Sequence, residues 1–549
     1  MTSFLSRHRW LWLVAGLLML AEFGLFHRMT RLQYAWVHPR WSDQIQYLTE
    51  SYQAYEVLHT QGWWQGIVYA CTNPAAQGTL HDIVAVVVFG VFGPSRLAAL
   101  DLNFAVFLAW QGFTLFAVRR ISRSAALGWL GFGLILGVAG PWSADAGSAI
   151  DFRLDHAAMC LWGITAATAL LTGGFRDLRW SLAFGGMVGL TIIERFLTGA
   201  YFAPVFLATA IWILCGEEKA RRLRNLMLAG AVAFLLAAPF FWLNWGWIYN
   251  YYWNGHFANA ESAARAPHLG FWGSIDYVLG GLGGRQLGSV FLIFSLVVTL
   301  IPLLLESFWD RVRAGLPKLD RDWLFLAAAF FVLPTVLLCL HRQKSEYVLG
   351  VLVPGLILVL LWIWNLLLTG LPLFARRTSP SLLAALAGAG LTVGLAFFVV
   401  RQLTPDYDQR NFIASSHKVR ELMERIYLTA KRNNMREPQI GMDRINDAVG
   451  GIMFRVTCYE KHREWVPFGD RLPTGILATD DTEVFTRLAE CDFVFLTDEM
   501  PGHGHWPYDQ QMKRLYPQLK AWCEAHLKHV DSFPLFDSQM SLYQRRDLH

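Results

Sequence analysis

The chain contains eleven apolar runs, each close to the length that a helix needs to cross a lipid bilayer. A membrane-spanning helix takes roughly 17 to 25 mostly apolar residues. The runs lie near residues 10–26, 97–118, 125–141, 157–173, 180–195, 199–215, 226–246, 286–305, 323–341, 347–368 and 381–401. With 54% hydrophobic and 16% charged residues, a soluble protein could not bury this much apolar surface. We therefore expect an α-helical polytopic membrane protein with about 11 transmembrane helices.

Clusters of basic residues follow alternate runs and predict the orientation of the chain. They are Arg7/Arg9, Arg119/Arg120/Arg123, Arg176/Arg179, Lys219/Arg221/Arg222/Arg224, Arg311/Arg313/Lys318/Arg321 and Arg376/Arg377. Eleven helices place all of these clusters on one side, which the positive-inside rule makes cytoplasmic. No small-residue cleavage site follows the first run, so it is interpreted as a retained helix. The chain is thus predicted to be N-in and C-out in the cytoplasmic (inner) membrane.

The apolar segment 83–93 is too short to span and is interpreted as an interfacial or re-entrant helix on the outer side. It belongs to a long first outer loop, from about residue 27 to 96. Earlier in that loop, apolar residues recur at steps of three and four, which predicts a helix lying on the membrane surface. These residues are Ile45, Leu48, Tyr52, Tyr55 and Leu58.

The composition changes after Leu403, which predicts a membrane domain over 1–403 and a soluble extracytoplasmic domain over 404–549. The second domain has helix-like stretches near 416–433 and 507–527. Strand-like runs lie at 439–442, 474–478, 492–497 and 541–546. Strands alternating with helices predict a small α/β fold.

Charge and cysteine usage exclude two classes of function. The net charge is only +5, and the basic residues stand in short clusters between apolar runs, a pattern of membrane topology rather than of nucleic-acid binding. The seven cysteines are scattered without metal-ligand spacing, which argues against both a zinc site and a disulfide framework. The expected surroundings of the chain are membrane lipid.

Polar residues gather at the predicted outer ends of the helices, where burying them in lipid is costly without a purpose. Acids suited to activating a nucleophile share this face with cations suited to holding a phosphate. They are Asp43 and His81 in the first loop, Asp151, Arg153 and Asp155 before the fourth helix, Arg195 at the end of the fifth, and Arg342 and Lys344 with Tyr347 after the ninth.

The order of these features resembles the glycosyltransferase C superfamily, in the branch of aminoarabinose transferases and protein O-mannosyltransferases. The family features are an acid in the first outer loop, an interfacial helix ending in FG, an acid at the exit of helix 3, a GL…TK helix end and a K…Y-L…P element. Their counterparts are Asp43, FGVFGPSRLAAL (89–100), Asp151 or Asp155, GLTIIER (189–195) with Arg195 at the Lys position, and Lys344, Tyr347, Leu349 and Pro354. The resemblance covers about residues 1–400 and rests on this order.

The resemblance implies a glycosyltransferase that moves a sugar from a polyprenyl-phosphate-linked donor to a hydroxyl of a glycan, lipid or protein acceptor at the outer face. The implied general base is Asp43, with Asp155 as the second catalytic candidate. Arg195 and Lys344 are the implied phosphate ligands. The other implied substrate-binding residues are Arg153, Asp151, His81, Arg342 and Tyr347.

The chain departs from the family pattern at three places. Asp43 is followed by Gln44 rather than by a second acid, and the usual Lys-Pro-Pro-Leu reads Gln77-Gly78-Thr79-Leu80. A basic phosphate contact is thereby missing, and His81 is the substitute that the sequence offers. Asp151 and Asp155 are spaced as DFRLD rather than as the DxD of metal-dependent oligosaccharyltransferases. We expect no obligatory cofactor. Because Asp151 and Asp155 do not form a DxD motif, they give no support for a bound divalent cation.

Simpler interpretations stand beside these roles. Asp43 also suits the positive end of a helix dipole, and Arg195 and Lys344 also suit interfacial anchors. The acids and Arg153 before the fourth helix also suit a salt-bridged loop. The rival functions are a transporter or flippase of a lipid-linked envelope precursor, although no internal repeat is visible, and a non-catalytic envelope-assembly scaffold.

Overall fold

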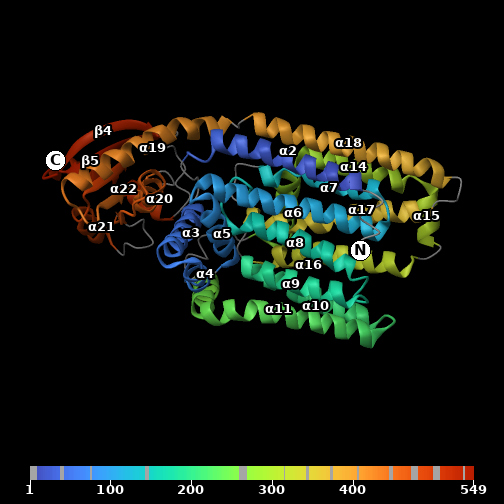
Figure 1. The fold of residues 1–549 in the computed structure, drawn as a ribbon. Helices are drawn as coiled ribbons and strands as arrows, with labels where there is room; N and C mark the ends of the chain where they lie inside the picture. The colour runs from blue at the N-terminus through green and yellow to red at the C-terminus, as the bar shows by residue number, and fades with distance from the viewer. Residues whose placement is uncertain are drawn as a thin grey trace.

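The computed structural model describes residues 9–37, 42–73, 77–142, 147–258, 269–313, 316–341, 345–370, 375–404, 407–443, 449–471, 480–498, 507–535 and 538–548. Figure 1 shows long helices running side by side. The helices α3, α4 and α5 and the C-terminal sheet lie at one end, and the N-terminus and α15 lie at the other. We call these the α3 end and the α15 end of the bundle.

All eleven predicted runs coincide with helices of the bundle. These are α2 (Arg9–Gln33), α6 (Arg96–Ser122), α7 (Ala125–Leu136), α8 (Leu154–Leu171), α9 (Leu178–Glu194), α10 (Leu197–Leu214), α11 (Lys219–Ile248), α13 (Phe271–Gly281) with α14 (Gly288–Leu303), α16 (Lys318–Leu340), α17 (Leu352–Gly370) and α18 (Ala375–Leu403). Among the described residues, nine helical segments are long and apolar enough to cross a membrane, and α7 and α9 are shorter, with 12 and 17 residues. The predicted helical polytopic fold is confirmed.

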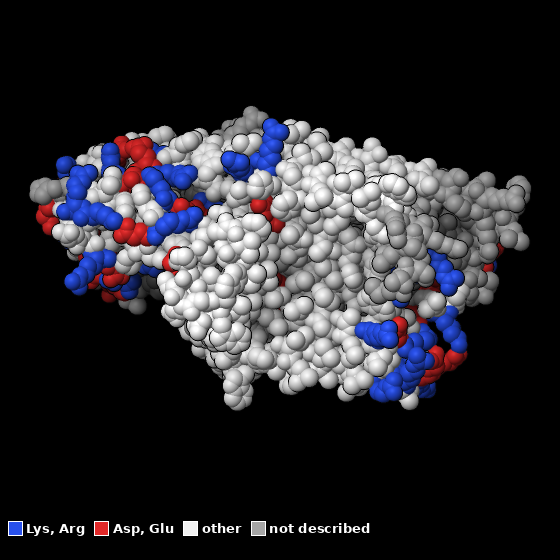
Figure 2. Space-filling view, viewed as in Figure 1, with Lys and Arg blue, Asp and Glu red and all other residues white. Residues whose placement is uncertain are grey.

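Short helical turns join several of these helices. They are η1 (Gly140–Trp142), η2 (Tyr249–Ala258), η3 (Leu282–Leu287), η4 (Glu346–Val351) and the helix α15 (Glu306–Arg313). In the face that Figure 2 shows, most Lys and Arg lie toward the two ends of the molecule, a smaller group lies between them at the top of the view, and uncharged residues cover most of the rest. This is the surface that a lipid-facing bundle requires.

At the α15 end, one buried acid ties two of the predicted cytoplasmic clusters together. Asp322, at the start of α16, accepts hydrogen bonds from Arg176 Nη1 at 2.5 Å and from Arg222 Nη2 at 3.0 Å. Trp212 Nε1 donates to the same carboxylate at 3.0 Å. Gly174 has a φ of 71°, and a Cβ there would lie 2.5 Å from an Asp322 oxygen, so the turn between α8 and α9 needs glycine to approach this acid.

We expect Asp322→Asn to destabilise the protein strongly. Removing one partner of a buried ion pair typically costs about 3–5 kcal/mol, because the remaining charge stays buried without compensation. The measurement is the thermal unfolding temperature of the purified protein in detergent. Asp310→Asn is the matched control, because Asp310 pairs with Arg313 at 3.3 Å with both side chains more than half exposed. Equal unfolding temperatures for the two variants would contradict the central role of Asp322.

The predicted helix in the first loop is α3 (Ser42–Gln61), followed by α4 (Trp63–Thr72) and α5 (Leu80–Phe92). Its apolar stripe packs against protein. Ile45, Leu48 and Tyr52 are at most 3% exposed, and the rings of Tyr52 and Phe89 of α5 lie 5.4 Å apart. The 13 residues of α5 form a helix too short to span, and it packs at the α3 end rather than through the bundle.

The C-terminal region is a small α/β fold, as predicted. Its elements are α19 (Tyr407–Arg432), β1 (Gln439–Met442), α20 (Gly451–His462), β2 (Gly469–Asp470), α21 (Asp481–Ala489), β3 (Phe493–Thr497), α22 (Pro507–His526), β4 (Leu527–Leu535) and β5 (Ser538–Arg545). The strand order is β2-β1-β3-β5-β4, with β1 parallel to β2 and β3, and β5 antiparallel to β3 and β4. All five residues of β3 are buried, as in a strand covered on both faces. The predicted strand 474–478 lies outside the described residues.

Candidate active site

A cavity of about 190 Å³ opens at the α3 end of the bundle, where segments distant in the sequence meet. Its polar side comes from α3, the segment before α5, the start of α8 and the junction of α9 and α10. Its other side comes from η2, the end of α16 and the segment entering η4. The lining residues are Asp43, Tyr47, Gln77, Arg153, Asp155, Arg195, Leu197, Ala200, Tyr201, Tyr251, Tyr252, Leu337, Leu338, His341, Ser345, Tyr347 and Val348.

The first of two ion pairs in the cavity joins Arg195 to Asp155. Arg195 ends α9, Asp155 lies in the first turn of α8, and Arg195 Nη1 is 2.7 Å from Asp155 Oδ1. Both side chains are mostly buried, at 12% and 5% exposed. A guanidinium stays protonated in proteins, and Asp155 balances its charge at this distance. Arg195 is thus a permanent cation in the wall of the cavity.

The second ion-paired group is centred on Arg153. Its Nη1 is 3.2 Å from Asp43 Oδ2, and its Nε is 3.1 Å from Asp151 Oδ2. The Gly147 N–H donates to the same Asp151 oxygen at 2.7 Å. Burial raises the pKa of Asp151 to about 6, against the lowering effect of Arg153 and of this N–H. Asp43 differs from the other carboxylates because its side chain is 49% exposed, which leaves it accessible from the cavity mouth.

One aromatic ring brings the two guanidinium groups together. The Tyr347 ring centroid lies 5.5 Å from Arg153 Cζ and 6.0 Å from Arg195 Cζ, both within cation–π distance. Gly147 has a φ of 83°, and a Cβ there would lie 2.8 Å from Tyr347 Cβ, so this loop needs glycine to pass the ring. The two cations therefore face a common region of the cavity.

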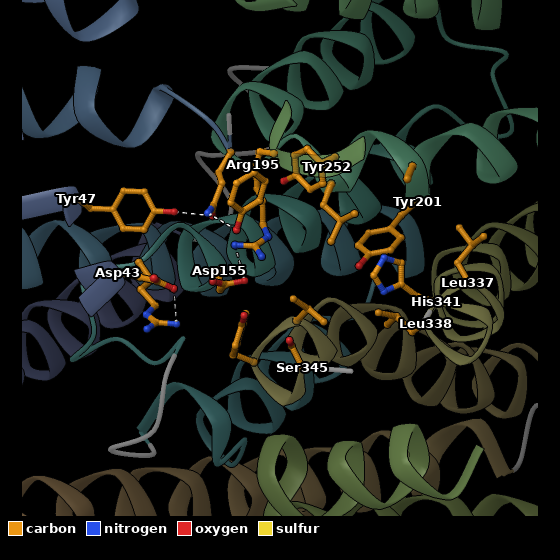
Figure 3. A pocket seen from close by; sticks show the side chains of 17 residues that line it. Asp43, Tyr47, Asp155, Arg195, Tyr201, Tyr252, Leu337, Leu338, His341 and Ser345 are labelled. Atoms are coloured by element: carbon orange, nitrogen blue, oxygen red, sulfur yellow. Dashed lines mark hydrogen bonds and ion pairs between the residues drawn. The ribbon is translucent and has the colours of Figure 1, made fainter. Parts of the chain in front are cut away.

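Neutral hydrogen-bonding groups line the space beside the charges. The Tyr47 hydroxyl donates to Gln77 Oε1 at 2.6 Å, and Gln77 Nε2 donates to the Tyr251 hydroxyl at 2.8 Å. Burial raises the pKa of Tyr47, so the phenol stays protonated and remains a donor. Figure 3 shows Asp43, Tyr47, Asp155 and Arg195 on one side of the cavity, and Leu337, Leu338 and His341 on the other.

A backbone contact holds Gln77 in the wall. Thr79 N donates to the Ile193 carbonyl at 2.9 Å, and Phe196 N donates to the Gln77 carbonyl at 2.6 Å. Between these bonds, a Cβ on Gly78 would lie 2.0 Å from the Glu194 carbonyl oxygen. The glycine lets the first loop approach the junction of α9 and α10, and this approach places Gln77 beside the cavity.

The structure brings most of the predicted site residues together. Asp43, Asp155, Arg195, Arg153 and Tyr347 line the cavity, and Asp151 lies directly behind Arg153. The predicted ligands Arg342 and Lys344 lie outside the described residues.

His81 does not line the cavity. Its Nδ1 lies 3.1 Å from Glu194 Oε1, both side chains are at most 3% exposed, and its ring packs 4.1 Å from the Phe152 ring. His81 therefore lies behind the wall that carries Arg195, rather than facing the space that a substrate would fill.

Several lining residues were not predicted from the sequence. Tyr47 could have been predicted, because it lies four residues after Asp43 and so shares a helix face with it. Tyr251 and Tyr252 belong to an aromatic stretch that stands out in the sequence, but nothing there separates site residues from interfacial anchors. Gln77 stands at the Lys of the usual Lys-Pro-Pro-Leu, so the resemblance marked its position but gave its amide no role. Among the described residues, no group of three or more His, Cys, Asp or Glu side chains is arranged to hold a metal ion.

Comparison with known proteins finds similarity at the level of the fold. No family model and no curated protein matches the chain. Two crystal structures of ArnT from Cupriavidus metallidurans, one in the apo state and one bound to undecaprenyl phosphate, each match with a TM-score of 0.55 and 16% identity over 98% of both chains. At this identity the likeness concerns the fold alone, and it confirms the resemblance predicted from the order of the sequence features.

Proposed function

Because the chain has the fold of a glycosyltransferase C protein over nearly its whole length, we propose that it is a membrane glycosyltransferase. Its donor would be a sugar linked through phosphate to a polyprenyl lipid, and its acceptor a hydroxyl group. The observation that carries this proposal is the cavity in which Arg153–Asp43 and Arg195–Asp155 meet from distant segments. The bound undecaprenyl phosphate of one ArnT structure supports the lipid-phosphate class of donor.

Arg195 and Arg153 are the proposed ligands of the donor phosphate. A guanidinium donates two parallel hydrogen bonds to phosphate oxygens, and these bonds gain strength in a mostly buried site. As the glycosidic bond breaks, negative charge grows on the leaving phosphate, and fixed cations stabilise it without reorganisation. Asp155 acts by holding Arg195 in place. The apolar wall of Leu337 and Leu338 suits the first isoprene units of the lipid.

Asp43 is the proposed general base. Its carboxylate accepts the proton of the acceptor hydroxyl while that oxygen forms a bond to the anomeric carbon. The bond between the anomeric carbon and the phosphate oxygen breaks, and its electron pair leaves with the polyprenyl phosphate. The half-exposed position of Asp43 suits an acceptor that arrives from outside the bundle. The neutral groups Tyr47, Gln77 and Tyr251 suit the hydroxyls of the transferred sugar.

A donor panel tests the proposal against its rivals. Membranes containing the protein are given single polyprenyl-phosphate sugars, with and without chelator, and release of undecaprenyl phosphate is measured with membrane extract as the source of acceptor. One active sugar is expected, with the release abolished by Asp43→Asn. Movement of intact donor between leaflets without release would favour a flippase. Neither release nor movement for any sugar would leave the scaffold as the better explanation.

The proposal places residues 1–403 in the cytoplasmic membrane, with the site and residues 404–549 outside the cytoplasm. Topology reporters test this placement. A reporter fused after Arg123 or Arg377 is expected to be cytoplasmic, and one fused after Arg401 to be outside, because the basic clusters stay inside. An Arg123 fusion that reports outside would mean that 83–93 crosses the membrane, and the location of the site would then be wrong.

A further inference from the structure

The C-terminal region contacts the helix that carries the proposed base. The Tyr52 hydroxyl of α3 donates to Glu460 Oε1 of α20 at 2.9 Å, and one turn later Glu56 of α3 accepts from the Tyr459 hydroxyl. The Tyr52 ring also packs 5.2 Å from the Tyr459 ring, and Tyr52 is fully buried. Two consecutive residues of α20 therefore hold two consecutive turns of α3.

Glu460 also fixes α20 to the transmembrane bundle. Arg96, in the first turn of α6, donates to it from Nε at 3.0 Å and from Nη2 at 2.7 Å. The Arg96 side chain is 3% exposed and that of Glu460 is 13% exposed. Arg463, at the end of α20, donates to the Pro94 carbonyl at 2.7 Å, just before α6. The Glu460 carboxylate thus accepts hydrogen bonds from both α3 and α6 and links these two helices.

These contacts bear on Asp43 because they hold the helix that carries it, while the Asp43 side chain itself is only half buried. Asp43 lies in the first turn of α3, and among the described residues its side chain pairs with Arg153 at 3.2 Å. Tyr52 lies nine residues further along the helix, about 13.5 Å away at 1.5 Å per residue. A rigid helix transmits its position over this length, so the contacts of α20 with Tyr52 act with the nearer Tyr47–Gln77 bond to set where Asp43 stands over the cavity.

We infer that Glu460 is a positioning residue for the proposed glycosyl transfer: through Tyr52 and Arg96 it fixes α3 against the bundle and thereby aims the Asp43 carboxylate. This inference rests on the proposed function, and it gives the C-terminal region a part in the chemistry. Misplacing a reacting group by about 1 Å costs up to about a hundredfold in rate. Donor binding is expected to change less than turnover, because Arg195 stays paired with Asp155 of α8 and Arg153 keeps its second partner, Asp151, outside α3.

Hydrogen exchange of the purified protein tests, without any substrate, whether Glu460 holds α3 in place. Glu460→Ala is expected to speed exchange in peptides from 42–61 relative to the parent protein. Glu464→Ala is the matched control, because Glu464 likewise accepts from a tyrosine and a cation, but its partners Tyr427 and Lys431 both lie in α19. Unchanged exchange of α3 in Glu460→Ala would overturn the inference. Should that variant fail to fold, Glu460→Gln and Tyr52→Phe replace it.

A double-mutant cycle tests whether Glu460 affects turnover through Asp43. The substrate is the polyprenyl-phosphate sugar found active in the donor panel. Glu460→Ala is expected to lower turnover by about ten- to a hundredfold with KM for that donor nearly unchanged. In an Asp43→Asn background the same change is expected to have little further effect. An equal loss in both backgrounds would overturn the inference, because a residue that only stabilises the fold acts independently of Asp43. Failure of the proposed function itself would appear separately, as parent protein inactive on every sugar.

Discussion

Asp43→Asn is expected to lower turnover by about 10²–10⁴-fold, the usual contribution of a general base. Asparagine keeps the shape of the side chain and removes its ability to accept the proton of the acceptor hydroxyl. Binding of undecaprenyl phosphate is expected to survive, because Asp151 still neutralises and orients Arg153 at 3.1 Å. Single-turnover rates and undecaprenyl phosphate affinity, measured in nanodiscs, separate the two effects.

Asp480→Asn is the matched control for this variant. Asp480 caps α21 by accepting from Glu483 N at 2.8 Å, and asparagine is an equally good cap. The control separates loss of a base from loss of an acid at a helix start. Near-normal turnover in Asp43→Asn would mean that Asp43 only interacts favourably with the dipole of α3. Another residue of the cavity would then have to be the base.

Arg195→Ala is expected to impair both donor binding and the chemical step, by about 10²–10³-fold in the single-turnover rate. In the proposed mechanism, this cation, unlike the base, would contact the phosphate both in the bound donor and in the departing product. Arg195→Lys is expected to lie between the parent and the alanine variant, because an ammonium does not reproduce the two-pronged contact of a guanidinium. The readouts are donor affinity and single-turnover rate for each variant.

Two further variants serve as controls for the Arg195 substitutions. Arg195→Ala leaves Asp155 buried without its partner, so Arg195→Ala with Asp155→Asn removes that cost and should still be slow. Arg179→Ala changes the same residue type at the exposed opposite end of α9 and is expected to behave like the parent. If the double variant binds and turns over donor normally, Arg195 serves only to neutralise Asp155.

The helices were predictable because apolar length and periodicity are visible in the sequence. The α3 stripe of Ile45, Leu48 and Tyr52 predicts a helix with one buried face, and the structure has that helix. Periodicity does not say what covers the face. The sequence suggested lipid, whereas the structure buries it against α5 and α20, which lies some 400 residues away.

The sequence predicted some of the residues that form the site, but it did not predict which of them form ion pairs with one another. The cost of burying charge singles out Arg195 and Asp155, but their 2.7 Å contact depends on how α8 and α9 are aligned along their shared length. Neutral residues such as Gln77 become visible only when the backbone contacts around Gly78 are known.

In the C-terminal region, the missed strands lack the pattern on which a prediction depends. β2 has two residues. β4 carries charges, contains Pro534, and has its pairing with β5 shifted between His529 and Asp531, which breaks the alternation of buried and exposed residues. Both lie at the edges of the sheet, where such irregularities are tolerated.

The ion pair between Asp43 and Arg153 has a consequence for the kinetic order of the proposed reaction. While Asp43 Oδ2 is paired with Arg153 Nη1 at 3.2 Å, this oxygen is occupied and is not free to accept the proton of an acceptor hydroxyl. A donor phosphate that takes hydrogen bonds from Arg153 loosens this pair and frees Asp43 when the anomeric carbon has arrived. We therefore expect compulsory binding of donor before acceptor, with undecaprenyl phosphate inhibiting competitively against the donor and not against the acceptor. Random-order inhibition patterns would contradict this. With the compulsory order, the acceptor hydroxyl would meet a free carboxylate oxygen only in the enzyme that already holds donor.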